Sequence, residues 1–342
     1  VHTGEVLADQ LARIGIILEV TPLDDSIMYP RIDQRNYTLF EMAIGYDAIP
    51  THLYYRFHSS QDFEGGGNYY CYHNDQVDKL LNEAWSTADR AKARDLLFQV
   101  QQILSEELPY IPLFITNDVH PFARGWTNWT LMPGGPISPL NRWTPIYIYN
   151  EEGETTFVIA YPAEPETLSP LTAGTGRSLW YSMLVYDSLL AYDENFNLVP
   201  WLAESWEISE DGKVITFHIR KGVVWHDGTP LTARDVAFTF QYIKEKQPTG
   251  GMYTPDIIKF FDHAEVVDNY TVKIYLTEPY LFALDAFGFE YIVPEHIWSQ
   301  IEDPDWDPSL APQYAIGSGP FKFVELSLIH ISEPTRPRLI SY

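Results

Sequence analysis

The chain has 342 residues, and 47 Asp and Glu against 22 Lys and Arg give it a formal net charge of −25. Such a surface repels nucleic-acid phosphates and anionic lipid headgroups, so we expect it to bind neither. The length is enough for two domains with sizeable cores, while the single cysteine, Cys71, excludes a disulfide framework within the chain.

The N-terminal part of the chain predicts one helix followed by two strands. Leu7 and Leu11 recur at helical spacing, and Gly15 can end this helix. Residues 16–20 then predict a short strand. Residues 37–46 predict a second, apolar strand that ends in the sequence GYD.

Two longer helices and a further strand follow. Asp75 can cap a helix over residues 74–84, where apolar side chains again recur at helical spacing. Residues 88–108 predict a second helix, which Pro109 stops. Residues 111–115 alternate apolar and other side chains, as a half-buried strand does.

The second half of the chain contains a hairpin and a capped helix. Residues 215–219 alternate apolar and polar side chains, and Gly212 can provide the positive φ of a turn before them. Gly228 marks a second turn. Thr232 then caps a helix, with Asp235 three residues later in a capping-box position. The apolar stripe of this helix consists of Val236, Phe240 and Ile243.

The stretch at residues 220–240 closely resembles the signature of the family 5 extracellular solute-binding proteins, the dipeptide-, oligopeptide- and nickel-binding components of ABC importers. Four further sequences follow the order found in the first third of such a protein. They are PETLSP at 165–170, LVPWLAESW at 198–206, IVPEH at 292–296 and GSGPF at 317–321. Residues 1–150 resemble the last third of the same family, through QLARIGI at 10–16 and NDQVDKLLNEA at 74–84.

The resemblance therefore implies the end of one module followed by the start of another. We expect residues 1–150 to be the C-terminal third of one module, 151–154 a linker, and 155–325 the N-terminal third of a second, with 191–310 as its small extra domain. A tandem polypeptide is the favoured explanation, and a circular permutant and a chimeric assembly are the alternatives. Residues 326–342 begin with a sequence that resembles a translated sequencing-library adapter, so we expect this segment to be foreign.

By resemblance, the fold class is α/β, a type II periplasmic-binding-protein-like fold present as two partial modules, with mixed sheets and flanking helices. The implied function is capture of peptides or similar small solutes by lobe closure, for delivery to an ABC permease in the membrane. The implied location is periplasmic or extracellular, and a membrane anchor in the full-length protein stays open. We expect no cofactor and no enzymatic activity. Because each part lacks the middle third of a module, we expect the chain as given to bind ligand weakly or not at all.

Aromatic side chains in loops after apolar strands suit a ligand cleft, because flat rings can cover peptide backbones or sugar faces. Asp47 is the only carboxylate in the segment where peptide-binding relatives place an acidic residue against the amino terminus of the ligand. The predicted ligand-binding residues are Asp47, Tyr46, Tyr69, Tyr70, Trp126 and Trp129.

Other functions stay open on the sequence alone. An oligosaccharide-binding module of the same fold would use the same aromatic segments, and a hydrolase or a peptide sensor or chaperone are further alternatives. His226 and Asp227 are neighbours on a turn and should point apart, so they do not predict an acid–base pair. His52, His58 and His73 lack the spacing of a metal site, so we predict no metal-binding residues, although nickel-binding relatives keep metal capture open.

Overall fold

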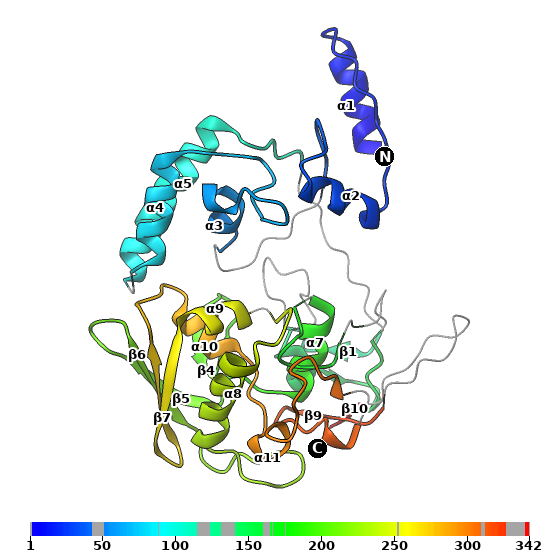
Figure 1. The fold of residues 1–342 in the computed structure, drawn as a ribbon. Helices are drawn as coiled ribbons and strands as arrows, with labels where there is room; N and C mark the ends of the chain where they lie inside the picture. The colour runs from blue at the N-terminus through cyan, green and yellow to red at the C-terminus, as the bar shows by residue number, and fades with distance from the viewer. Residues whose placement is uncertain are drawn as a thin grey trace. The chain divides into compact units, whose positions relative to one another are not determined.

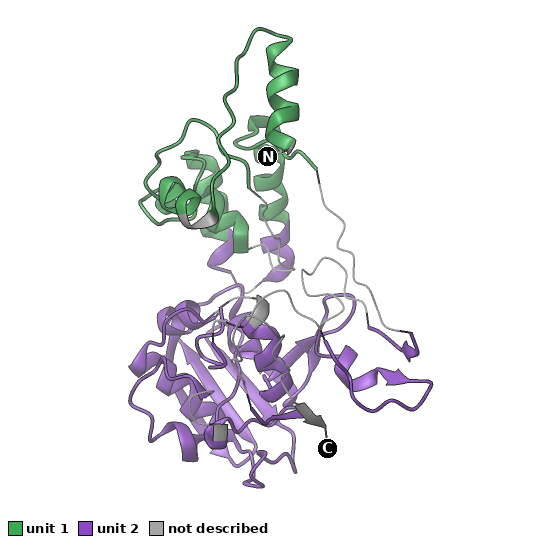
Figure 2. Cartoon of the chain, turned by 90° about the vertical axis from the view of Figure 1, so that its right-hand side faces the viewer, with its two compact units in different colours: residues 1–83, 95–115 green, residues 84–94, 116–342 purple. Residues whose placement is uncertain are grey.

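The computed structural model describes residues 2–42, 51–87, 89–114, 124–130, 141–159, 165, 167–174, 176–251, 253–308, 312–325 and 339–341. The chain divides into two compact units, residues 1–83 with 95–115 and residues 84–94 with 116–342 (Figure 2). The described part of the first unit contains only helices and loops, and the second unit combines sheets with helices. The predicted α/β class is confirmed.

The first unit is built around two amphipathic helices. Its helical elements are α1 (His2–Ala12), α2 (Asp25–Asp33), α3 (Thr51–Phe57), a 3₁₀ turn (Ser59–Gln61), α4 (Asp75–Trp85) and α5 (Arg90–Glu107), the last two continuing into residues 84–94. Val77 of α4 and Val100 of α5 have no exposed surface. Asn74 Nδ2 donates to Glu107 Oε1 at 2.9 Å, so the start of α4 lies beside the end of α5 (Figure 1). The two helices are therefore antiparallel.

Of two helix ends predicted in the first unit, one is confirmed and the other is wrong. Gly15 has φ 83°, and its N–H donates to Ala12 O at 3.1 Å, so it ends α1 as predicted. The cap of α4 is Asn74 rather than Asp75. Asn74 Oδ1 accepts from the N–H of Val77 at 3.1 Å, while Asp75 is already helical.

The predicted strands of residues 1–115 are wrong wherever the structure describes them. Residues 16–20, 37–42 and 111–114 are extended or irregular and have no strand partner. A strand satisfies its backbone N–H and C=O groups through a neighbouring strand, and the described part of this unit offers none. Ile17 is 94% exposed and Ile111 is 74% exposed, so the apolar side chains also lack a surface to pack on.

The second unit is centred on an antiparallel sheet with the strand order β5-β6-β8-β7. These strands are β5 (Ala203–Ile208), β6 (Val214–Ile219), β8 (Thr271–Leu276) and β7 (Phe261–Asp268). Ile215, Phe217 and Ile219 are buried and the residues between them are not, as their alternation predicts. Gly212 has φ 69° in the turn between β5 and β6, which confirms the hairpin.

Helix α8 (Ala233–Lys246) packs on the buried face of this sheet (Figure 1), with the Phe240 ring 6.1 Å from that of Phe261. The predicted capping box is confirmed: Thr232 Oγ1 accepts from the N–H of Arg234, and the Thr232 N–H donates to Asp235 Oδ2 at 2.8 Å. The predicted stripe is buried at Val236, Phe240 and Ile243.

The remaining elements of the second unit are short. They are β1 (Trp126–Thr127), α6 (Thr144–Tyr147), β2 (Tyr149–Asn150), α7 (Gly176–Val185), β3 (Leu190–Tyr192), β4 (Leu198–Pro200), α9 (Thr254–Phe260), α10 (Ala283–Phe289), α11 (Glu295–Trp298), a 3₁₀ turn (Pro312–Tyr314), β9 (Phe321–Phe323) and β10 (Leu339–Ser341). A Cβ atom at Gly317 would lie 1.8 Å from Val185 O, so only glycine fits where the chain passes the end of α7. No helix in the described ranges is both long enough and apolar enough to cross a membrane.

Candidate functional site

The predicted ligand-binding residues fall into three groups. Tyr46 and Asp47 lie outside the described residues. Tyr69 and Tyr70 lie together in the first unit, and Trp126 lies with Trp129 in the second. The four described candidates therefore form two separate groups, one in each unit.

The loop that carries Tyr69 and Tyr70, residues 58–73, is organised by Asn68. This side chain has no exposed surface. Its Nδ2 donates to His58 O at 3.3 Å and to Tyr72 O at 2.8 Å, while its Oδ1 accepts from the N–H of Tyr72 at 3.1 Å. One side chain thus joins both ends of the loop, which fixes the backbone where the two tyrosines emerge.

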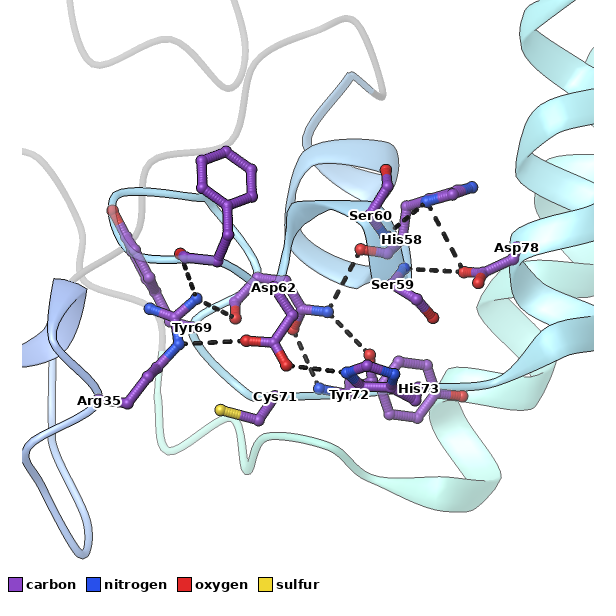
Figure 3. Close-up of polar contacts among 12 residues, drawn as sticks. Arg35, His58, Ser59, Ser60, Asp62, Tyr69, Cys71, Tyr72, His73 and Asp78 are labelled. Carbon is purple, nitrogen blue, oxygen red and sulfur yellow. Dashed lines mark hydrogen bonds and ion pairs between the residues drawn. The ribbon is translucent and has the colours of Figure 1, made fainter.

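A polar network holds the same loop from outside. Figure 3 shows Asp62 between two partners: its Oδ1 accepts from Arg35 Nε at 3.2 Å, and its Oδ2 lies 2.8 Å from His73 Nε2. The hydrogen bond from His73, aided by Arg35, lowers the pKa of the Asp62 carboxyl, so this residue is ionised at neutral pH.

The two tyrosines have different surroundings. The Tyr70 ring stacks on Phe57 and Tyr110, with centroids 5.4 Å and 5.3 Å away. Burial raises the pKa of Tyr70 to about 12, against the opposing effect of the Arg56 guanidinium. Tyr69 is half-buried, and the Arg56 guanidinium carbon lies 4.5 Å from its ring centroid. Tyr70 is therefore a packing residue, and its role in ligand binding stays a prediction. Tyr69 and Arg56 together form a mixed aromatic and cationic surface.

The site does not have the geometry of a nucleophilic or metal centre. The Cys71 Sγ points away from the His73 ring (Figure 3) and lies 3.9 Å from Tyr37 Oη. In the part of the chain that the structure describes, no group of three His, Cys, Asp or Glu side chains could hold a metal ion.

The pair that could suggest acid–base catalysis in the second unit is also separated. His226 Nε2 lies 2.8 Å from Gly319 O, whereas Asp227 Oδ2 lies 2.7 Å from His296 Nε2. The two side chains contact different partners, as expected for neighbours on a turn.

Trp126 and Trp129 form a half-buried aromatic cluster with Phe157. The Phe157 centroid lies 4.8 Å from that of Trp126 and 5.6 Å from that of Trp129. Trp129 Nε1 donates to Trp126 O at 3.2 Å, which orients one indole relative to the other. The segment is anchored further along by Asn141, whose Nδ2 donates to Thr130 O at 2.6 Å. These rings present flat apolar surface, which is what stacking on a ligand requires.

A buried charge pair joins this aromatic segment to the sheet region. Arg142 Nη1 lies 2.9 Å from Asp187 Oδ1, and both side chains are nearly buried. Asp187 also accepts from Trp201 Nε1 at 2.6 Å and from Ser318 Oγ at 2.9 Å. The Arg142 guanidinium lies 5.0 Å from the Trp201 ring. Buried ion pairs are favourable only when their remaining donors and acceptors are satisfied, and this one meets that condition.

Sequence reasoning did not identify several residues that shape these sites: Arg35, Arg56, Asn68, Arg142 and Asp187. Arg142 and Asp187, for example, lie 45 residues apart along the chain, so no local pattern marks their contact. A usable signal existed only for Arg56, which stands among aromatic residues in the sequence YYRF of a strongly acidic chain.

Comparison with known proteins gives a consistent result for about half of the chain. Residues 197–329 match the family model described as bacterial extracellular solute-binding proteins, family 5 Middle. The dipeptide-binding protein of Escherichia coli is 33% identical over 190 residues, which cover 49% of this chain and 35% of that protein. A putative ABC transporter peptide-binding protein of Brucella ovis is 34% identical over 161 residues, covering 45% of this chain and 29% of that protein. The chain spans about a third of the length of these relatives.

Segments of solved structures are also similar to part of this chain. NikZ from Campylobacter jejuni, in complex with Ni(L-His), is 31% identical with a TM-score of 0.45 and covers 51% of this chain and 34% of its own. The oligopeptide-binding protein AppA of Bacillus subtilis, in complex with a nonapeptide, is 30% identical with a TM-score of 0.43, covering 48% and 33%. The similarity to the family 5 model is a sequence match over residues 197–329.

Proposed function

We propose that this chain is part of the solute-binding component of an ABC importer, because residues 197–329 match the model of the family 5 extracellular solute-binding proteins. Its ligands are peptides or similar small solutes, and it binds them without chemical turnover. The protein works in the periplasm or outside the cell and delivers its ligand to an ABC permease, and a membrane anchor in the full-length protein fits this role.

The observation that supports this proposal best is the sequence match, together with the names of the relatives. The two relatives described above are named for peptide or dipeptide binding. These names favour peptides over oligosaccharides. The tyrosines at 69 and 70 and the tryptophans at 126 and 129 would supply rings that cover a peptide backbone.

The mechanism that follows is capture by closure of a type II periplasmic-binding-protein-like fold. Two lobes joined by a hinge bury the ligand between them, and the permease recognises the closed form. Closure is driven by the difference in ligand affinity between the closed and open states. The organisation predicted above, with a C-terminal third at 1–150 followed by an N-terminal third at 155–325, remains part of this proposal.

The proposal is tested by ligand screening of the full-length protein. We expect a mixture of short peptides to raise its melting temperature, and oligosaccharides of similar size to leave it unchanged. Stabilisation by oligosaccharides alone, or release of hydrolysed products on incubation with either ligand, would contradict the proposed function.

Asp47 gives a sharper test of the binding site. Asp47→Asn should weaken the binding of peptides that have a free amino terminus by about tenfold, because a charge-assisted hydrogen bond is lost. Acetylated peptides should be unaffected. Asp9→Asn is the control, since Asp9 is exposed and forms an ion pair with Arg13 four residues away. An equal loss for free and acetylated peptides would remove the amine-anchor role.

A further inference from the structure

His226 forms three hydrogen bonds with the segment 317–319 of the second unit. Its backbone N–H donates to Gly317 O at 2.8 Å. Both nitrogens of its ring face the same segment, since Gly317 N lies 3.2 Å from Nδ1 and Gly319 O lies 2.8 Å from Nε2. The half-buried imidazole of His226 is therefore bound to the backbone on both sides of residue 318.

These contacts define which nitrogen of the His226 ring carries the proton. A backbone N–H can only donate, so Nδ1 accepts from Gly317 and carries no hydrogen. A carbonyl oxygen can only accept, so Nε2 carries the hydrogen and donates it to Gly319 O. Both bonds exist together only in the neutral imidazole with its proton on Nε2. A second proton on Nδ1 would set two donors against each other and leave the Gly317 amide without its acceptor.

The segment 317–319 is held from its other side by the end of α7. The Gly319 N–H donates to Val185 O at 2.9 Å. A Cβ atom at Gly317 would lie 1.8 Å from the same oxygen, so the backbone passes α7 at the closest distance that a residue allows. The contact with Val185 does not depend on the charge of an imidazole. Only the His226 side of the segment therefore responds to protonation of this ring.

The charged groups that face the ring come from three parts of the unit. Burial lowers the pKa of His226, and the positive charge of Lys322 on β9 acts in the same direction. The hydrogen bond to Gly319 O and the carboxylates of Asp187 and Asp227 act against them, with the smaller total effect. Each carboxylate also contacts another basic side chain. The surroundings thus favour the neutral ring, as the two hydrogen bonds require.

We propose that His226 is a pH-sensitive contact that holds the segment 317–319 when its ring is neutral and releases the Gly317 amide when Nδ1 takes up a proton from solvent. No covalent bond changes in this step, because the proton occupies the lone pair that had accepted from Gly317. The contact of Gly319 with Val185 remains. The inference goes beyond the proposed function, since it needs no ligand and concerns the backbone that leads into β9.

The direction of the pH effect follows from the lowered pKa. In the unfolded chain this histidine titrates near its ordinary value of about 6.5. Between that value and the lower pKa of the folded chain, the unfolded state binds more protons. The stability that the contact contributes is therefore fully present above about pH 6.5, and it is lost as the pH falls through the folded pKa. Acidification weakens the contact.

Hydrogen exchange of the 342-residue chain, resolved to single amides by NMR, tests the proposal. We expect the protection factor of the Gly317 amide to fall at least about tenfold between about pH 7.5 and about pH 5, because its acceptor is lost. Protection factors are used because they correct for the pH dependence of exchange itself. The Gly212 amide, which donates to Ser209 O at 2.9 Å, is the internal reference and should keep its protection.

Two substitutions of His226 separate the acceptor from the titration. In H226N, the Asn Oδ1 takes the place of Nδ1 and gains no proton in this range, so Gly317 should stay protected at both pH values. In H226A the acceptor is absent, so protection should be low at both. H263N is the matched control, because His263 is an exposed histidine of the same unit that pairs with Asp262. It should keep the wild-type pH profile.

Equal protection of the Gly317 amide at both pH values in the wild-type chain would overturn the proposal. So would a pH-dependent loss that persists in H226N. If either variant fails to fold, wild-type chain labelled with ¹⁵N-histidine gives a second test. His226 is then the imidazole with a nuclear Overhauser effect to the Gly317 amide proton. A single ring hydrogen on Nε2 at about pH 7.5 supports the proposal, and a hydrogen on Nδ1 at that pH rejects it.

Discussion

Asn68 illustrates how much of the candidate site depends on single side chains. It is fully buried, and its three hydrogen bonds join residues 58 and 72 across the loop that carries Tyr69 and Tyr70. Asn68→Ala leaves buried backbone groups without partners, so we expect a loss of roughly 2–4 kcal/mol in the free energy of unfolding of the first unit. Urea titration followed by tyrosine fluorescence measures this loss.

The control for that substitution is Asn36→Ala, which removes an exposed amide of the same unit. It should change the free energy of unfolding by less than about 0.5 kcal/mol. Equal stabilities for the Asn68 and Asn36 variants would show that the loop does not depend on the Asn68 amide.

Glu290 links the stability of the second unit to pH. Its side chain is buried, its Oε2 has no hydrogen-bond partner among the described residues, and burial raises its pKa from 4.5 to about 8. The folded chain therefore binds a proton that the unfolded chain releases near pH 4.5. The contribution of this proton to the free energy of unfolding is fully present below that pH. It decreases by about 1.4 kcal/mol per pH unit as the pH rises towards 8.

Glu290→Gln should remove this dependence, because glutamine cannot ionise. We expect the variant to exceed the wild type in stability at pH 9 and to match it more closely at pH 5, as measured by urea titration with tryptophan fluorescence. Glu210→Gln, at an exposed position, should keep the wild-type profile. A wild-type profile for the Glu290 variant would mean that this carboxyl is not the titrating group.

At the scale of elements, α8 shows a helix whose start is set by local chemistry. Thr232 and Asp235 satisfy backbone and side-chain groups reciprocally at its first turn. Thr232→Ala should cost about 1 kcal/mol in the free energy of unfolding, and Thr232→Ser should restore most of it. Thr156→Ala removes an exposed hydroxyl as the control. Chemical unfolding of the second unit provides the measurement. An unchanged free energy of unfolding in Thr232→Ala would argue against the capping box.

The segments at 16–20 and 111–114 show the opposite case, in which local pattern is not enough. Their apolar side chains predict strands, yet both segments are unpaired in the described structure and expose Ile17 and Ile111. Helices satisfy their own backbone groups, whereas a strand depends on a neighbour elsewhere in the chain. Sequence pattern can therefore propose a strand but cannot supply the partner that forms it.

At the scale of the whole molecule, the two units should differ in stability. The described part of the first unit has no sheet and exposes large apolar side chains, while the second unit encloses a four-stranded sheet under α8. Because buried apolar area is the main source of stability, we expect the first unit to unfold first. The most exposed of its large apolar side chains are Ile17, Ile111, Ile14, Leu39 and Phe114.

Hydrogen exchange measured by mass spectrometry tests this expectation. Amides of α4 and α5 should exchange faster than those of β6 and β8, and urea should give two transitions rather than one. The central strands of the second unit serve as the internal reference. A single cooperative transition with equal protection in both units would show that they stabilise each other.

The sequence by itself determined those features that nearest neighbours along the chain can satisfy. The Gly15 helix end, the Gly212 turn and the Thr232 cap all depend on atoms within a few residues, and all are present. The signature around residues 220–240 likewise lies in one continuous stretch, within the residues that match the family model.

Only the tertiary structure decided which distant groups meet. It placed Arg142 against Asp187, joined residues 58 and 72 through Asn68, and placed the Arg56 guanidinium beside the Tyr69 ring. It also showed that the strands predicted at residues 16–20 and 111–114 have no partner strand in the described structure. Hydrogen-bond satisfaction and burial are properties of surroundings, and residues far apart in the chain supply those surroundings only after folding.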